Sequence, residues 1–378
     1  MEKIMINDLI DFRRELHMHP EVSGNEFQTQ GRIISFLKTL GIEGKEIGGT
    51  GVFVVFDSGN EGKTIMLRSD HDALPIQEIN SFEHQSIYDG VSHKCGHDGH
   101  TAIMCGVAKH FNENPIERGK IILMFQPAEE NGEGAKAILV DEQFEFQPDL
   151  VFALHNLPGY PLNKVVYKEG NFTPAVKSII VKLDGKTAHA AEPELGINPA
   201  ATISELIAMF DEVSQPDLER DDFALTTPIY IHMGELSYGV SAGHGEIHYT
   251  LRTWSSEVMN ELTERILNRI DDIAAKHQIS TSISWTEEFD SNKNDPKAVD
   301  YVSQAISANS LDSEMREWPF KWGEDFGLFT QRFPGAMFGI GSGENCPALH
   351  NPDYDFPDEI IGTGIKMFTS IAQKAINE

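Results

Sequence analysis

The chain has 378 residues, which is too many for one hydrophobic core, so we expect two domains. Its formal net charge is −29, and this excludes nucleic acid as a partner because phosphate binding needs a basic surface. No apolar run approaches the length of a membrane span, and the charged stretch 1–16 predicts an amphipathic helix rather than a signal peptide. We therefore expect a cytoplasmic protein without a membrane partner.

Short apolar runs alternate with helical patterns from the N-terminus to about residue 170. The predicted strands are 51–56, 63–70, 120–127 and 149–155, and the predicted helices between them are 100–111 and 134–140. This alternation predicts an α/β fold in which helices cover the faces of a sheet.

A second set of elements occupies residues 175–289. It reads as strand, amphipathic helix, two strands, long helix and strand, which is the split ferredoxin-like order. The long helix follows Ser255 and Ser256, whose side chains can cap its free N–H groups. Helical and strand patterns of the first kind resume after residue 289. We therefore predict a discontinuous first domain, 1–174 and 290–378, with an α+β domain, 175–289, inserted into it.

The stretch 93–100 is the richest in residues that can carry chemistry. Cys95 and His97 are two residues apart, so in extended backbone their side chains leave on the same side. Thiolate and imidazole are preferred ligands of zinc and similar ions, and Gly96 lets the backbone approach a metal closely. A Cys-X-His pair alone is more often an incidental part of a polar helix entry, so a metal site needs further groups.

Two adjacent carboxylates, Glu129 and Glu130, follow the apolar strand 120–127 closely. Active sites collect at strand ends in open α/β sheets. Neighbouring carboxylates point in different directions, so one can ligate a metal while the other acts as a base. A solvated acidic turn is the commoner fate of such a pair.

Three further polar groups follow the same logic. His155 stands where a strand ends, His350 lies in a loop before the last helix, and Asp72 can orient a ligand imidazole. Each histidine taken singly is more often a satisfied loop residue. At least four apparent strand ends offer groups that can ligate a metal, and these ends should lie at one edge of the sheet. One shared metal site therefore explains these residues better than unrelated structural roles for each of them.

Together these stretches resemble the aminoacylase/carboxypeptidase family of two-metal metallopeptidases. The resemblance is strongest to its amidohydrolase branch, with hippurate hydrolases, indole-acetyl-amino-acid hydrolases and N-acetyldiaminopimelate deacetylases. The matching segments span nearly the whole chain in the expected order: RRELHMHPE at 13–21, DALP at 72–75, CGHDGHT at 95–101, QPAEE at 126–130, LH at 154–155, GKTAHAAEPELGINPA at 185–200, GEDF at 323–326, PG at 334–335 and LHNPDYDF at 349–356.

The resemblance implies a zinc-peptidase-like catalytic domain that binds two divalent ions, Zn²⁺ or Mn²⁺. Cys95 takes the place of the ligand that bridges both ions. His97 and His155 would complete one metal, and Glu130 and His350 would complete the other.

The resemblance also implies roles for residues that are not ligands. Glu129 falls on the position of the general base, and Asp72 falls on the aspartate that supports a ligand. His189 matches a lid histidine that in this family reaches an active site, often that of a partner subunit. Arg252 matches an arginine of the lid and is expected to bind substrate. The inserted domain would then be the lid and the surface of a homodimer.

Two positions depart from the pattern of the branch. Methionine usually stands where this chain has His71, so His71 is not counted as a ligand. The lid segment before Arg252 lacks the usual Asn-Val-Ile-Pro, which puts substrate recognition by the lid in question. His244 is a candidate to compensate, although a solvated turn histidine is the more common situation.

The predicted function is hydrolysis of the amide bond of N-acyl amino acids, or of similar N-acylated small amines, to a carboxylate and a free amine. A dipeptidase or carboxypeptidase of the same fold is the nearest alternative. A small-molecule-binding homologue without turnover is a second, and a hydrolase that uses Cys95 as nucleophile is a weaker third.

Overall fold

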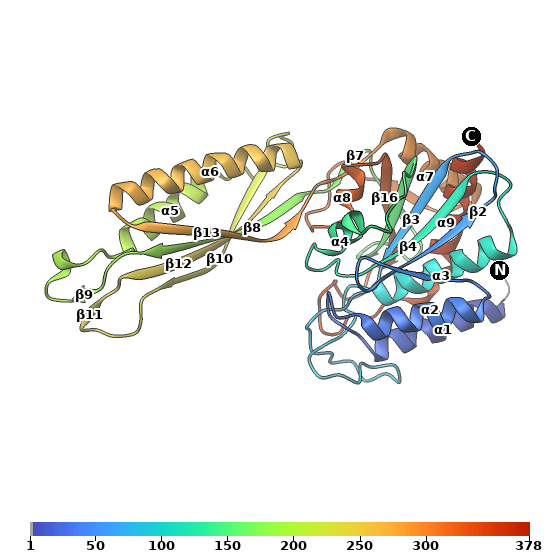
Figure 1. Ribbon diagram of the computed structural model, residues 1–378, viewed down its shortest axis with the longest axis horizontal. Helices are drawn as coiled ribbons and strands as arrows, with labels where there is room; N and C mark the ends of the chain where they lie inside the picture. The colour runs from blue at the N-terminus through green and yellow to red at the C-terminus, as the bar shows by residue number, and fades with distance from the viewer. Residues whose placement is uncertain (1–2) are drawn as a thin grey trace. The chain divides into compact units, whose positions relative to one another are not determined.

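The structure is a computed structural model that describes residues 3–378, and it divides into two compact units (Figure 1). The first unit consists of the described residues up to Phe172 together with Asn292–Glu317 and Glu324–Glu378. The second consists of Thr173–Ser291 and Trp318–Gly323. The short segment Trp318–Gly323 lies outside the range that the sequence patterns gave to the inserted domain.

A mixed sheet forms the centre of the first unit. Its eight strands lie in the order β1 (Lys45–Ile47), β2 (Gly51–Asp57), β4 (Lys120–Gln126), β3 (Thr64–Asp70), β5 (Leu150–Pro158), β16 (Gly335–Gly343), β6 (Val165–Tyr167) and β15 (Ser313–Met315). Strands β4, β3, β5 and β16 run parallel to one another, whereas β2 is antiparallel to β4. The carboxyl ends of β3, β4 and β5 therefore meet at one edge, and the predicted fold class is confirmed.

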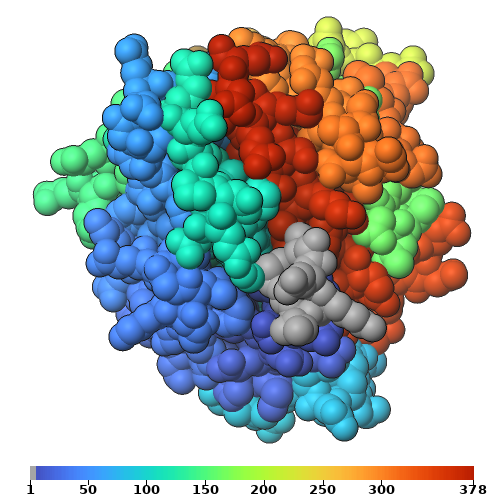
Figure 2. Space-filling view, turned by 90° about the vertical axis from the view of Figure 1, so that its right-hand side faces the viewer, coloured from blue at the N-terminus to red at the C-terminus, as the bar shows by residue number. Residues whose placement is uncertain are grey.

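Helices pack on this sheet because their apolar faces complete its core. They are α1 (Lys3–Met18), α2 (Phe27–Thr39), α3 (His97–Glu113), α4 (Gly134–Val140), α7 (Pro296–Ala308), α8 (Gly327–Thr330) and α9 (Ile361–Asn377). The C-terminal helix α9 contacts both α3 and α7, and in Figure 2 the red C-terminal segment lies between cyan and orange segments. The close contact between α9 and α3 needs a glycine at position 364, because a Cβ added there would lie 2.5 Å from Cδ1 of Ile103.

The second unit is a four-stranded antiparallel sheet with two helices on one face (Figure 1). The strand order is β10 (Ala224–Met233), β12 (His244–Thr253), β8 (Ala175–Asp184) and β13 (Ser280–Phe289), and the helices are α5 (Ala200–Val213) and α6 (Ser256–His277). Ser255 caps α6, since its side chain accepts a hydrogen bond from the N–H of Val258. The helices and the inner sheet face enclose a separate apolar core.

The remaining elements are short. They are the paired strands β9 (Ala188–His189) and β11 (Val240–Ser241), the paired strands β7 (Gly170–Thr173) and β14 (Asn292–Asn294), and the 3-10 turns η1 (Pro193–Leu195) and η2 (Asp358–Ile360). Within residues 3–378, no helix combines the length and the apolar character needed to cross a membrane.

Candidate metal centre

The strand ends of the central sheet carry four of the candidate site residues. β3 leads into Asp72, β4 leads into Glu129 and Glu130, and β5 contains His155 near its carboxyl end. These three strands are neighbours and run in the same direction. Their parallel pairing is the reason that residues far apart in the chain arrive at one edge of the sheet.

Cys95 and His97 lie at the start of α3, on either side of Gly96. Gly96 adopts a left-handed conformation with φ 95°, and a Cβ there would lie 2.6 Å from Oδ1 of Asn156, so only glycine fits this turn. The turn joins Cys95 to His97. His350 is tied to the same region, because its N–H donates to the carbonyl oxygen of Lys94 at 2.8 Å.

All five residues predicted to ligate a metal come together. The ligating atoms of Cys95, His97 and His155 lie within 4.8 Å of one another, and so do those of Cys95, Glu130 and His350. Cys95 Sγ is 3.5 Å from His155 Nε2. The two oxygens of Glu130 lie 3.8 Å from His97 Nε2 and 3.5 Å from His350 Nε2. Cys95 is thus the member common to both groups of three.

Glu129 and Asp72 lie beside this cluster in different ways. Glu129 Oε2 is 4.0 Å from His97 Nε2. Asp72 Oδ1 lies 3.1 Å from His97 Nδ1, which leaves Nε2 facing the other ligand atoms. Asp72 Oδ2 accepts hydrogen bonds from the N–H of Glu130 at 3.0 Å and from the hydroxyl of Ser23 at 2.7 Å. Asp72 therefore orients the His97 ring, whereas Glu129 lies beside the cluster and accepts the N–H of Asp325 on Oε1 at 3.3 Å.

The donor set fits cations. Among the described residues, His97 Nε2 and Glu130 Oε1 are buried and have no hydrogen-bond partner. Buried polar atoms without partners are costly and rare, so these two need a ligand that the polypeptide does not supply. A thiolate, three imidazoles and a carboxylate are the ligands of zinc and related ions.

The ionisable groups of the cluster also favour a bound cation. Burial, together with the nearby carboxylates of Glu130 and Glu129, raises the pKa of the Cys95 thiol well above its usual value. Burial also raises the pKa of Glu130 to about 7, although His97 opposes this. For Glu129, burial and the neighbouring Glu324 raise the pKa well above its ordinary range. Acidic groups crowded without enough positive charge are the environment that a bound cation relieves.

The two predicted lid residues belong to the second unit, whereas the five proposed ligands belong to the first. His189 is exposed on β9, and its Nδ1 accepts a hydrogen bond from the N–H of Ala191 at 3.0 Å. Arg252 lies on β12, where its Nε donates to the carbonyl oxygen of Lys321 at 3.0 Å. His244 is exposed, 3.9 Å from a carboxylate oxygen of Glu235. His71 is buried in the first unit, and neither ring nitrogen has a hydrogen-bond partner within the described chain.

A buried ionic group beneath the cluster had no role in the sequence analysis. The guanidinium of Arg68 donates to Asp70 at 2.6 Å and to Asp325 at 2.8 Å, and it lies 2.9 Å from Glu324. Asp70 in turn lies 2.5 Å from His100 Nδ1. A signal for this group was present, since Arg68 is a charged residue that directly follows three apolar residues, 65–67, in a predicted buried strand.

Known proteins resemble this chain along nearly its whole length. The model of peptidase family M20/M25/M40 matches residues 66–374. The chain is 34% identical to an N-acetyl-L-cysteine deacetylase of Bacillus subtilis (strain 168), with 93% of this chain and 84% of the relative covered. It is 31% identical to an N-acetyldiaminopimelate deacetylase of Bacillus pumilus (strain SAFR-032), with 98% of each chain covered.

A solved structure is similar as well. It is the Bacillus subtilis YXEP protein, described as a dinuclear metal binding peptidase from the M20 family, with a TM-score of 0.86, 27% identity, and 100% of this chain and 99% of that one covered. The resemblance inferred from the motifs is confirmed, and so is the prediction of a hydrolase that acts on amide bonds. The chain belongs to peptidase family M20/M25/M40.

Proposed function

We propose that this protein is a metal-dependent amidohydrolase that removes the acyl group from the nitrogen of an amino acid or a similar small amine. The observation that carries the proposal is the meeting of five ligating side chains in two groups of three, each within 4.8 Å, with the carboxylate of Glu129 beside them. Two relatives that align along most of the chain are named deacetylases of N-acetylated amino acids, which supports the substrate class.

The site would hold two divalent ions, Zn²⁺ or Mn²⁺. Cys95 would contact both ions, His97 and His155 would complete one, and Glu130 and His350 would complete the other. When bound, the ions would make a water molecule more acidic and would stabilise negative charge on the amide oxygen. Asp72 would hold the His97 ring in the tautomer and direction that ligation needs.

Glu129 would act as the general base and then as the general acid. Its carboxylate lies beside the proposed ligands, with Oε2 4.0 Å from His97 Nε2, so it can take a proton from the attacking water. The same carboxyl group would then deliver that proton to the leaving nitrogen. Glu129 suits this role because its neighbour Glu130, whose oxygens lie near His97 and His350, is itself a proposed metal ligand.

His189 and Arg252 are proposed to bind the substrate. The N–H of Ala191 occupies Nδ1 of His189, so in the neutral ring the proton sits on Nε2, which can donate to a developing oxyanion. Arg252 uses Nε for the carbonyl of Lys321, which leaves its terminal N–H groups for a substrate carboxylate.

The test combines one variant with a substrate panel. Glu129→Gln should lower kcat by roughly 10²- to 10⁴-fold, as expected for loss of a general base, while the protein still binds two ions. The panel holds N-acetyl amino acids, hippurate and dipeptides, and the N-acyl amino acids should give the highest kcat/KM. Undiminished activity of Glu129→Gln would reject its role. Preference for dipeptides would favour a dipeptidase, and metal-loaded protein inactive on the whole panel would favour a binding protein.

We further propose a homodimer that forms through the second unit, which would also serve as the lid. Its edge strand β10 exposes apolar side chains, with Ile229 60% and Ile231 44% exposed. An exposed apolar sheet edge is a surface that a second copy can cover. Ile231→Lys should therefore shift the mass measured in solution from dimer to monomer, and an unchanged mass would remove this edge from the interface.

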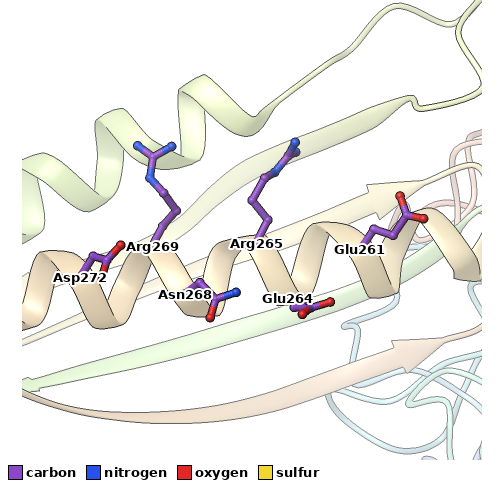
Figure 3. Close-up of a pocket in the computed structure, with 6 residues that line it drawn as sticks. All are labelled: Glu261, Glu264, Arg265, Asn268, Arg269 and Asp272. Atoms are coloured by element: carbon purple, nitrogen blue, oxygen red, sulfur yellow. The ribbon is translucent and has the colours of Figure 1, made fainter.

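The outer surface of α6 is a less suitable contact. A hollow there is lined only by polar and charged side chains, with Arg265 and Arg269 pointing to the same side of the helix (Figure 3). The six lining residues are Glu261, Glu264, Arg265, Asn268, Arg269 and Asp272. Burying so many charges without matched partners is costly, so we assign the dimer contact to β10.

The protein would work in the cytoplasm, where the thiol of Cys95 stays reduced.

A further inference from the structure

Glu26 is a buried carboxylate from the N-terminal region that reaches the loop of the proposed base. It stands directly before α2 and is 0% exposed, yet its side chain does not cap that helix. Its Oε1 accepts the N–H of Ala128 at 2.8 Å and the N–H of Gly24 at 2.9 Å. Its Oε2 accepts the hydroxyl of Thr50 at 2.7 Å. Both oxygens of Glu26 are thus used to hold loops.

Ala128, the residue held by Glu26, has an unusual backbone conformation. Its φ is 50°, in the left-handed region that residues with a Cβ avoid. A non-glycine residue keeps such a conformation only where its surroundings fix it, and such residues gather at functional sites. The surroundings here are Glu26, which binds the N–H, and Gly134, whose N–H donates to the carbonyl oxygen at 3.0 Å.

The conformation of Ala128 decides where the next residue points. In extended backbone, Glu129 and Glu130 would leave on opposite sides. Here an oxygen of each lies near the same imidazole nitrogen, His97 Nε2, at 4.0 Å and 3.8 Å. The left-handed turn just after β4 therefore brings the base and a proposed ligand to one site.

Glu26 differs from the other anchors of this loop. Asp72 binds the N–H of Glu130, but it also contacts His97, so changing it would disturb a proposed ligand directly. Within the described residues, the side-chain hydrogen bonds of Glu26 go to Gly24, Thr50 and Ala128 and to none of the five proposed ligands. Because the N–H of Glu130 is also bound by Asp72, loss of Glu26 should disturb Glu129 more than this proposed ligand.

We propose that Glu26 is a positioning residue for Glu129. By holding Ala128 in the left-handed conformation, it aims the carboxylate of Glu129 at the reacting water. This inference rests on the proposed role of Glu129 as the base. A misdirected base slows the chemical step without weakening substrate binding, since small displacements of reacting groups lower rates by large factors.

The main test compares Glu26→Ala with Glu26→Gln. Glu26→Ala should lower kcat by roughly 10- to 100-fold, with KM and the content of two metal ions unchanged. Glu26→Gln keeps an amide oxygen for the N–H of Ala128 and can donate to Thr50, so its kcat should stay within about threefold of the parent. Thr50→Val, which removes one contact of Glu26 but not the bond to Ala128, is the matched control and should also stay within about threefold.

A rescue experiment separates positioning from general support of the fold. Glycine adopts positive φ without strain, so Ala128→Gly should need the anchor less. Adding Ala128→Gly to Glu26→Ala should recover at least about threefold in kcat. If Glu26→Ala does not fold, Glu26→Asp serves instead, because its shorter side chain keeps the charge but withdraws the oxygen from Ala128, and its kcat should fall by a similar factor.

Each result decides the proposal. Full kcat in Glu26→Ala or Glu26→Asp would overturn it, and so would a loss of activity that follows metal content or that Ala128→Gly does not reduce. If Glu129→Gln is inactive while Glu26→Ala is fully active, only this inference fails. If Glu129→Gln is active on the panel, the assigned base itself is wrong, whatever Glu26 does.

Discussion

His17 is a buried histidine that binds two carboxylates at once. Its Nδ1 lies 2.9 Å from Asp98 and its Nε2 lies 3.0 Å from Glu78. Both partners accept hydrogen bonds, so both ring nitrogens carry protons and the ring is charged. Although burial disfavours the charge, and Arg13 opposes it, the bonds to Asp98 and Glu78 raise the pKa of His17 to about 9.

This shift predicts a pH-dependent part of the free energy of unfolding. The folded pKa of about 9 lies above the ordinary value of 6.5, so the contribution is complete below pH 6.5 and is lost as the pH rises through 9. Its full size is on the order of 3 kcal/mol. Urea unfolding of the parent and of His17→Gln at several pH values should show a difference that shrinks between pH 6.5 and 9. A difference that stays constant over this range would contradict the assignment.

Among the individual site residues, the sequence patterns predicted most directly those that lie close together in the chain. The Cys95 and His97 pair and the adjacent Glu129 and Glu130 could be recognised within a few positions, and the structure brings them together. The role of Glu26 could not be recognised in this way, because its hydrogen-bond partner Ala128 is 102 positions away in the chain. Local patterns contain no information on which distant backbone group a buried carboxylate will bind.

Helix α4 begins against the loop of the proposed base. A Cβ added at Gly134, its first residue, would lie 1.7 Å from the carbonyl oxygen of Pro127. That oxygen belongs to backbone, which cannot move aside as a flexible side chain can. The start of α4 and the end of β4 can therefore approach only with glycine at this position.

Gly134→Ala should lower the free energy of unfolding by about 1–3 kcal/mol, as overpacking does. It should also reduce kcat, since Pro127 precedes Ala128 and Glu129 directly. Gly362→Ala in α9 is the matched control, because a Cβ there meets no atom within 4 Å and alanine favours helix. Thermal melts and steady-state kinetics check both variants. Equal stability of Gly134→Ala and the parent would show that the loop relaxes freely.

Element prediction succeeded where apolar runs were long. The strands at the centre of the sheet, such as β4 and β5, are buried on both faces and appear in sequence as unbroken apolar runs. The segment Trp318–Gly323 was assigned differently by sequence, because nothing in its composition shows that it belongs to the second unit. Membership of a unit depends on long-range contacts such as that between Arg252 and Lys321.

The two units have separate apolar cores, and the tryptophans are unevenly divided between them. All four tryptophans, Trp254, Trp285, Trp318 and Trp322, lie within the second unit. The proposed metal ligands all lie in the first unit. Tryptophan fluorescence therefore reports on the unit without the metal site, whereas far-UV circular dichroism reports on both.

Removal of metal should consequently destabilise one unit and spare the other. An ion at 100 times its dissociation constant stabilises the folded state by about 2.7 kcal/mol, so chelation should lower the circular dichroism transition of the first unit by roughly 5 °C or more. The fluorescence transition should move by less than about 1 °C, because two apolar cores can unfold separately. Cys95→Ala, which removes the proposed ligand common to both ions, is the control, since chelator should then no longer shift either signal. Equal shifts of both signals in the parent protein would mean that the units unfold as one.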